Sequence, residues 1–83
     1  MSSQEAGARV LLYGKPGCHL CEHARAIVAR VCSDLGTSFE EVDITTSAEL
    51  METYGEQIPV TFVDGRQHDF WRVDESRLRS ALG

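Results

Sequence analysis

The sequence predicts a single α/β domain in which three helices pack against a mixed four-stranded sheet, in the order β-α-β-α-β-β-α. Three observations support this prediction. A chain of 83 residues has room for one domain only. Strand-like apolar runs alternate with segments of helical periodicity, which is typical of an α/β fold. An Asp64-Gly65 pair between two strand-like runs adds an antiparallel hairpin.

The domain is expected to span residues 9–83. Residues 1–8 are small and polar, and they are predicted to form a disordered N-terminal segment. The first strand is predicted over 9–13, because this apolar run is too short for a helix. It is expected to end at the turn residues Gly14-Lys15-Pro16-Gly17.

A helix is predicted next, because apolar residues recur at helical intervals and form one stripe. The residues of this stripe are Leu20, Ala24, Ile27, Val28, Val31 and Leu35. Gly36 is expected to end the helix. A strand is then predicted over 38–44. In it Phe39 faces the opposite way to Val42 and Ile44, and the sequence does not decide which face is buried.

The next boundary is a helix start. Thr46 and Glu49 have the spacing of a capping box, with Thr46 as the N-cap. The short helix that follows is expected to direct Leu50, Met51 and Tyr54 inward.

Two strands and a last helix complete the predicted domain. The strands, over 59–63 and 66–71, flank the hairpin turn. Asp74 is expected to cap the helix, with Val73 and Leu78 as a hydrophobic staple. The predicted inner face of this helix consists of Leu78, Ala81 and Leu82. The first two strand–helix steps are expected to be right-handed crossovers that give a parallel pair, and the hairpin adds an antiparallel edge.

Charge and hydropathy exclude two classes of partner. The net charge of −5 argues against a nucleic-acid binder, which normally presents a basic face. The longest apolar run, over residues 10–13, is far short of the roughly 20 residues that span a bilayer. With no signal peptide in the polar N-terminal segment, the expected location is the cytoplasm.

The cysteines carry the chemistry. Cys18-His19-Leu20-Cys21 is a C-x-x-C motif at the predicted start of a helix, where backbone N–H groups and the helix dipole stabilise a thiolate on Cys18. Lys15 and His19 flank this sulfur with positive or ionisable groups. Cys21 lies one turn on, within disulfide reach. This placement predicts thiol–disulfide exchange, in which Cys18 attacks and Cys21 resolves the mixed disulfide.

Two other residues have an ordinary and a functional interpretation. Cys32 lies eleven residues beyond Cys21, too far along one helix to pair with it, and is expected to be a core thiol. The functional alternative is a regulatory or intermolecular thiol. Pro59 follows Ile58 where a loop enters a strand. The residues alone favour an ordinary strand-initiating proline. The functional alternative is a cis-proline beside the cysteines that receives a substrate chain.

Two alternatives to redox chemistry remain open. The first is a metal site with nitrogen and sulfur donors from Cys18, His19, Cys21 and His23. The metal would be zinc or, between two copies of the chain, an iron–sulfur cluster. The second alternative is a non-catalytic binding module, in which the two motif thiols have no chemical role.

The chain resembles the glutaredoxin branch of the thioredoxin-fold superfamily over about residues 9–82. The match rests on segments 13–21, with the sequence YGKPGCHLC, 41–44, 58–60 and 64–65. Its C-H-L-C form is similar to small bacterial glutaredoxin-like proteins. The resemblance implies a thioredoxin-like fold, a nucleophilic Cys18, a resolving Cys21 and a cis Pro59 facing them. It also implies that Lys15 lies near the nucleophile. The residues expected to bind or orient the substrate are Lys15, Pro16, His19, Ile58 and Pro59.

The sequence departs from glutathione-using glutaredoxins in two places. Gln57 precedes Ile58 and Pro59 where they carry Thr-Val-Pro, and Trp71 and Arg72 stand near their Gly-Gly. Phe70 and Trp71 either pack over the sheet edge or form an apolar rim for a protein partner. Bulky Trp71 and Arg72 argue against a glutathione site. We therefore expect no tightly bound cofactor, with glutathione as the one candidate. The expected partners are a protein disulfide as substrate and either glutathione or a thioredoxin-reductase system as reductant, with the chain acting as a monomer.

Overall fold

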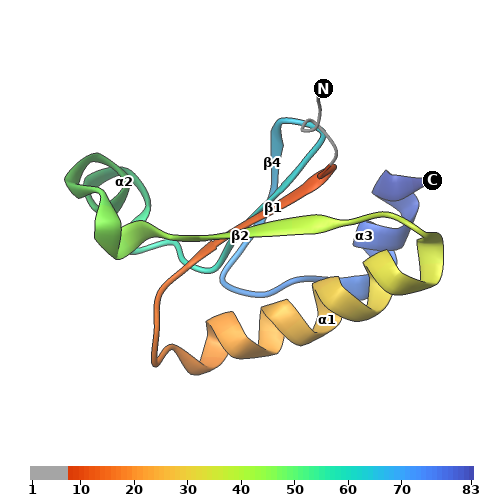
Figure 1. Cartoon of the computed structure of the whole chain (residues 1–83), viewed down its shortest axis with the longest axis horizontal. Helices are drawn as coiled ribbons and strands as arrows, with labels where there is room; N and C mark the ends of the chain where they lie inside the picture. The colour runs from red at the N-terminus through yellow and green to blue at the C-terminus, as the bar shows by residue number, and fades with distance from the viewer. Residues whose placement is uncertain (1–7) are drawn as a thin grey trace.

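The computed structural model describes residues 8–83. The prediction for residues 1–8 lies outside this range except for Ala8, which is exposed. The elements are β1 (Val10–Gly14), α1 (His19–Leu35), β2 (Phe39–Asp43), the 3₁₀ helix η1 (Ile44–Thr46), α2 (Ala48–Tyr54), β3 (Val60–Val63), β4 (Arg66–Phe70) and α3 (Glu75–Leu82). This confirms the predicted order of strands and α-helices. Figure 1 shows α1 and α3 along one side of the sheet and α2 at one end.

The four strands form one mixed sheet in the order β2-β1-β3-β4. β1 and β2 are parallel, whereas β3 runs antiparallel to both β1 and β4. The expectation that the second strand–helix step is also a parallel crossover is wrong. α2 has only seven residues, none of them buried, so it bridges β2 and β3 at one end of the sheet without crossing back along it.

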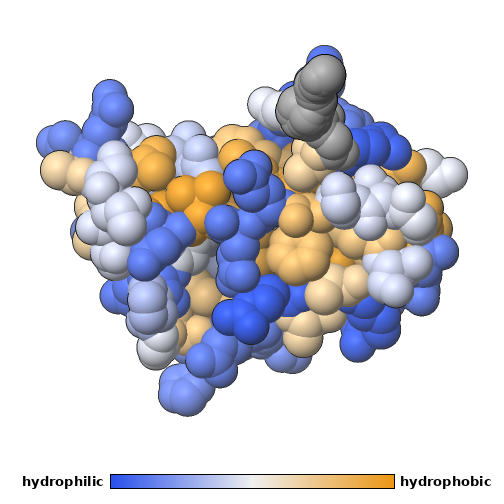
Figure 2. Space-filling view, viewed as in Figure 1, coloured by the Kyte–Doolittle hydropathy of each residue, from blue (hydrophilic) through white to orange (hydrophobic). Residues whose placement is uncertain are grey.

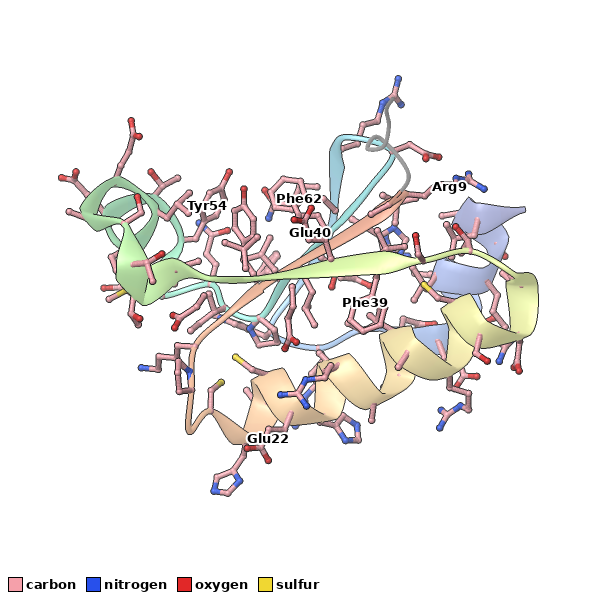
Figure 3. The ribbon with its side chains drawn as sticks, in the orientation of Figure 1. Arg9, Glu22, Phe39, Glu40, Tyr54 and Phe62 are labelled. Atoms are coloured by element: carbon pink, nitrogen blue, oxygen red, sulfur yellow. The ribbon has the colours of Figure 1, made fainter. Side chains whose placement is uncertain are left out.

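The core lies between the sheet and the two helices α1 and α3. Its buried members are Val10, Leu12, Ala24, Val28, Val31, Cys32, Val63, Val73, Leu78 and Leu82. The predicted stripe of α1 is shifted: Leu20 and Leu35 are exposed, and Cys21 and Cys32 are buried instead. Phe39 packs against this core, which settles the face of β2 (Figure 3).

The opposite face of the sheet carries an aromatic cluster. Tyr13, Tyr54 and Phe62 have ring centroids 5.1 to 5.9 Å apart, and Figure 3 shows Tyr54 and Phe62 on the side away from α1. Tyr54 and Leu50 are half-buried, but Met51 is exposed, so the predicted inward face of α2 is only partly correct.

Turns and caps fix the ends of the later elements. Asp64 and Gly65 have φ values of 52° and 84°, the left-handed pair that a tight two-residue hairpin requires. Asp74 caps α3 by accepting a hydrogen bond from the Arg77 backbone N–H at 3.0 Å, as predicted. Ala81, expected on the inner face of α3, is exposed. Among residues 8–83, no helix is long and apolar enough to span a membrane.

The cap of α2 differs from the prediction. Ser47, not Thr46, accepts the hydrogen bond from the Leu50 backbone N–H, at 3.2 Å. Thr46 belongs to η1, and its hydroxyl donates to the Asp43 carbonyl at 2.9 Å. The helix therefore begins one residue later than a capping box starting at Thr46 requires.

Candidate active site

Cys18 is the N-cap of α1. Its backbone is extended, with φ −96° and ψ 114°, and its Sγ accepts a hydrogen bond from the Cys21 backbone N–H at 3.2 Å. Its carbonyl accepts from the Glu22 N–H at 3.0 Å and closes the first helical turn. The helix begins at His19, and the predicted place of Cys18 at its start is confirmed. Backbone donors at a helix N-terminus interact more strongly with a thiolate than with a thiol.

Cys21 lies in a different environment although it is only one turn away. The residue is 6% exposed, whereas Cys18 is half-buried. Burial raises the pKa of the Cys21 thiol to about 11, and the hydrogen bond and charge of Cys18 act in the same direction. The Lys15 backbone amide and ammonium group act the other way without cancelling these effects. At neutral pH, Cys21 is therefore held as the protonated thiol.

Gly14 lets the end of β1 approach the second cysteine. A Cβ atom at this position would lie 3.1 Å from the Cys21 Sγ and 3.2 Å from its Cβ. A side chain here would push α1 away from the strand. From the sequence, Gly14 is expected only as a turn residue; its position directly before the motif loop is the signal for this contact.

Pro59 lies at the same end of the sheet as the cysteines. Tyr13 pairs with Val60, which places Pro59 beside Gly14, where the chain enters the motif loop. The Ile58–Pro59 peptide bond is cis. The family resemblance implies this geometry, whereas the residues alone favour an ordinary strand-initiating proline. Pro59 is buried and Ile58 is half-buried. Two predicted site segments, distant in sequence, are thus brought together.

A cavity of about 300 Å³ opens beside the motif loop on the β2 side. Lys15 and Pro16 contribute to its wall, together with Arg25, Glu41 and Asp43. Arg25 and Glu41 form an ion pair of 2.9 Å between α1 and β2. Nothing in the sequence near Arg25 indicates that its side chain meets β2.

Figure 2 shows hydrophilic and hydrophobic residues interspersed over the face of the molecule in view. Lys15, Pro16 and His19 are all exposed around the half-buried Cys18. Glu22, in the first turn of α1, points away from the sheet (Figure 3). The exposed predicted site residues therefore flank one half-buried cysteine.

The third cysteine stands apart from this site. Cys32 is buried in the core, as predicted, and burial raises its pKa. Within residues 8–83, no three His, Cys, Asp or Glu side chains are grouped closely enough to hold a metal ion. The donors Cys18, His19, Cys21 and His23 are therefore not assembled into the four-ligand set of a structural zinc site.

These features define a class of protein: a thioredoxin-fold domain with two cysteines at the start of its first helix. A glutaredoxin of Archaeoglobus fulgidus shares the fold, with a TM-score of 0.62 at 20% identity over 90% of this chain and 86% of that one. Residues 9–83 match the family model described as Glutaredoxin-like domain (DUF836), and the chain belongs to this family.

Two relatives have higher identity to this chain. The X-ray structure of protein XcR50 from X. campestris has 35% identity and a TM-score of 0.74, covering 88% of this chain and 93% of that one. The uncharacterized protein Rv0508 of Mycobacterium tuberculosis is 34% identical over 79 residues, which is 89% of this chain and 81% of that protein. The predicted family and thioredoxin-like fold are confirmed.

Proposed function

We propose that this protein is a thiol–disulfide oxidoreductase that uses Cys18 as nucleophile and Cys21 as resolving thiol. The observation that carries the proposal is the asymmetry between the two sulfur atoms. Cys18 is accessible and receives a backbone N–H, while Cys21 is buried and held protonated by a pKa of about 11. A nucleophile needs access, and a resolving thiol must stay protonated until the mixed disulfide has formed.

The exchange takes place in two balanced steps. The Cys18 thiolate attacks one sulfur of the substrate disulfide, the substrate S–S bond breaks, and the departing thiolate takes up a proton. Cys21 then loses its proton and attacks the Cys18 Sγ, releasing the second substrate thiol. Two electrons have moved to the substrate, and the protein holds a Cys18–Cys21 disulfide. A thiol reductant, either glutathione or a thioredoxin-reductase system, restores both thiols.

The surrounding residues receive roles that follow from their positions. Lys15 and His19 add positive or ionisable groups beside the exposed sulfur, and Lys15 also counteracts the rise in the pKa of Cys21. Pro16, Ile58 and Pro59 shape the surface against which the substrate chain lies. The proposed setting is a cytoplasmic monomer that binds protein disulfides without a resident cofactor.

The test is a redox titration of the purified protein followed by intact mass and thiol counting. A reversible two-electron step should close a disulfide between Cys18 and Cys21 and leave Cys32 as a thiol. Cys18→Ser should abolish exchange, and Cys21→Ser should stop at a mixed disulfide on Cys18. Cys32→Ser is the matched control and should retain dithiol turnover. Turnover in the Cys18→Ser variant, or a failure to form the intramolecular disulfide, contradicts the proposal.

A further inference from the structure

Trp71 is held in one position although much of it faces solvent. The residue is 53% exposed, yet its indole N–H donates to the Glu56 carbonyl at 2.9 Å. Its backbone N–H is shared between the carbonyls of Pro59, at 2.8 Å, and Gln57, at 3.2 Å. The ring of Phe70, itself 49% exposed, packs edge-on against the indole with centroids 5.0 Å apart. We call Phe70 and Trp71 the aromatic ledge.

The backbone at Trp71 is unfavourable for a tryptophan. Its φ of 65° lies in the left-handed region, which glycine adopts freely and residues with a Cβ adopt at a cost in free energy. Burial of the side chain does not explain this choice, because about half of the residue remains accessible. Strain kept at an exposed aromatic residue points to a use for the side chain outside the fold.

The aromatic ledge is continuous with the proposed site. Phe70 pairs with Val60, the residue after Pro59, and Trp71 is hydrogen-bonded to Pro59 itself. Pro59 in turn lies beside Gly14, where the chain enters the loop that carries Cys18. A polypeptide whose cysteine is bonded to Cys18 and which crosses Pro59 therefore meets the ledge with its flanking residues. The ledge is already rigid, so little conformational entropy is lost when it binds.

We propose, resting on the oxidoreductase function above, that the aromatic ledge binds an apolar side chain next to the substrate cysteine and so selects protein disulfides over glutathione disulfides. Glutathione consists of glutamate, cysteine and glycine units, and it offers no apolar side chain for two aromatic rings to contact. A protein segment with leucine or phenylalanine beside its cysteine does. The ledge determines specificity and takes no part in the exchange of electrons.

The first experiment compares wild-type protein with Trp71→Gly, which removes the indole and suits the positive φ. The substrates are a peptide disulfide with leucine beside the cysteine, the same peptide with glycine there, and oxidised glutathione. For the leucine peptide, kcat/KM should fall about tenfold or more, as for loss of an aromatic anchor. For the other two substrates it should change less than about twofold. Phe70→Ser provides a second variant, and Leu35→Ala, an exposed leucine at the far end of α1, is the control.

The second experiment uses fluorescence, since Trp71 is the single tryptophan of the chain. In Cys21→Ser, each peptide is trapped as a mixed disulfide on Cys18. The leucine peptide should shift the emission to shorter wavelength and the glycine peptide should not. Equal shifts for the two peptides, or equal losses of kcat/KM for all substrates in Trp71→Gly, overturn the ledge proposal. So does a wild-type dimer that Trp71→Gly dissociates, which assigns the ledge to a second copy. Wild-type protein that reduces no substrate contradicts the oxidoreductase function itself.

Discussion

Alkylation of the reduced protein tests the asymmetry between the two cysteines. With less than one equivalent of iodoacetamide at pH 7.5, the label should enter Cys18 and largely spare Cys21. The reason is that burial and the neighbouring sulfur raise the pKa of Cys21 from 9.0 to about 11. A difference of about 2 units leaves about 100-fold less thiolate at this pH.

The higher basicity of this thiolate offsets part of that loss. With a Brønsted coefficient of about 0.45, a Cys21 thiolate of pKa about 11 is about eightfold more nucleophilic than one of pKa 9.0. The net rate of Cys21 alkylation therefore falls about tenfold. Steric burial slows it further. The reference is the rate of Cys21 in the same chain unfolded in urea, measured by tryptic mapping with fragment ions that separate the two motif cysteines.

A matched variant separates the causes of the shift. Cys18→Ala removes the hydrogen bond and the charge of the neighbouring sulfur but leaves the burial, which is the largest cause. The pKa of Cys21 should therefore decrease from about 11 and still remain above 9.0. The reasoning is refuted if native Cys21 is alkylated as fast as in the unfolded chain, or faster than Cys18.

Three further predictions concern stability and are measured by denaturant unfolding. Gly14→Ala should lower the free energy of unfolding by about 1–3 kcal/mol, because its Cβ meets the Cys21 sulfur at 3.1 Å; an unchanged value contradicts the packing argument. Leu78→Ala, in the core, should cost about 2–5 kcal/mol, whereas exposed Leu35→Ala should cost less than about 1 kcal/mol. Because folding raises the pKa of Cys21, the contribution of this thiol to the free energy of unfolding is fully present below pH 9 and is lost as the pH rises towards 11. Cys21→Ala should therefore lose less stability at alkaline pH than the wild type, and identical pH profiles for the two proteins would contradict this reasoning.

Elements with a local chemical signal were predictable from the sequence. The Asp64-Gly65 turn, the Asp74 cap and the start of α1 at the C-x-x-C motif each depend on residues within a few positions of one another. Their hydrogen bonds form inside one segment, so neighbouring residue types suffice to specify them. The pair Cys18 and Cys21, which lie one helical turn apart, is the part of the candidate site that was predictable from such local signals.

The cap of α2 shows where local rules compete. Thr46 has the spacing to Glu49 that a capping box requires, but Asp43 makes competing hydrogen bonds. Its carboxylate accepts from the Thr45 N–H at 2.9 Å and from the Thr45 hydroxyl at 2.6 Å. A 3₁₀ turn forms, and the Thr46 hydroxyl donates back to the Asp43 carbonyl. Ser47 is then the first free hydroxyl oxygen, and it caps the helix. The pattern was present, but a stronger local hydrogen-bonding group lay three residues earlier.

The rest of the site depends on contacts between distant segments, which no spacing rule encodes. Pro59 lies beside Gly14, at the entry to the motif loop, because β3 pairs antiparallel with β1, whereas the sequence suggested two parallel crossovers. Arg25 reaches Glu41 because α1 lies over β2. The shift of the α1 stripe from Leu20 to Cys21 has the same origin, since the face that is buried is set by where the sheet lies.

The proposed selection of protein disulfides over glutathione disulfides depends on these long-range contacts. The cavity beside the motif loop is lined by two cations, Lys15 and Arg25, and two carboxylates, Glu41 and Asp43, so its formal charges cancel. Glutathione carries net negative charge, and a cavity without net charge gives it no electrostatic advantage. The cysteines themselves do not discriminate, because exchange requires only an accessible disulfide. On the ledge proposal, substrate preference comes instead from Phe70 and Trp71 beside Pro59, which offer a contact that only a polypeptide with an apolar side chain can use.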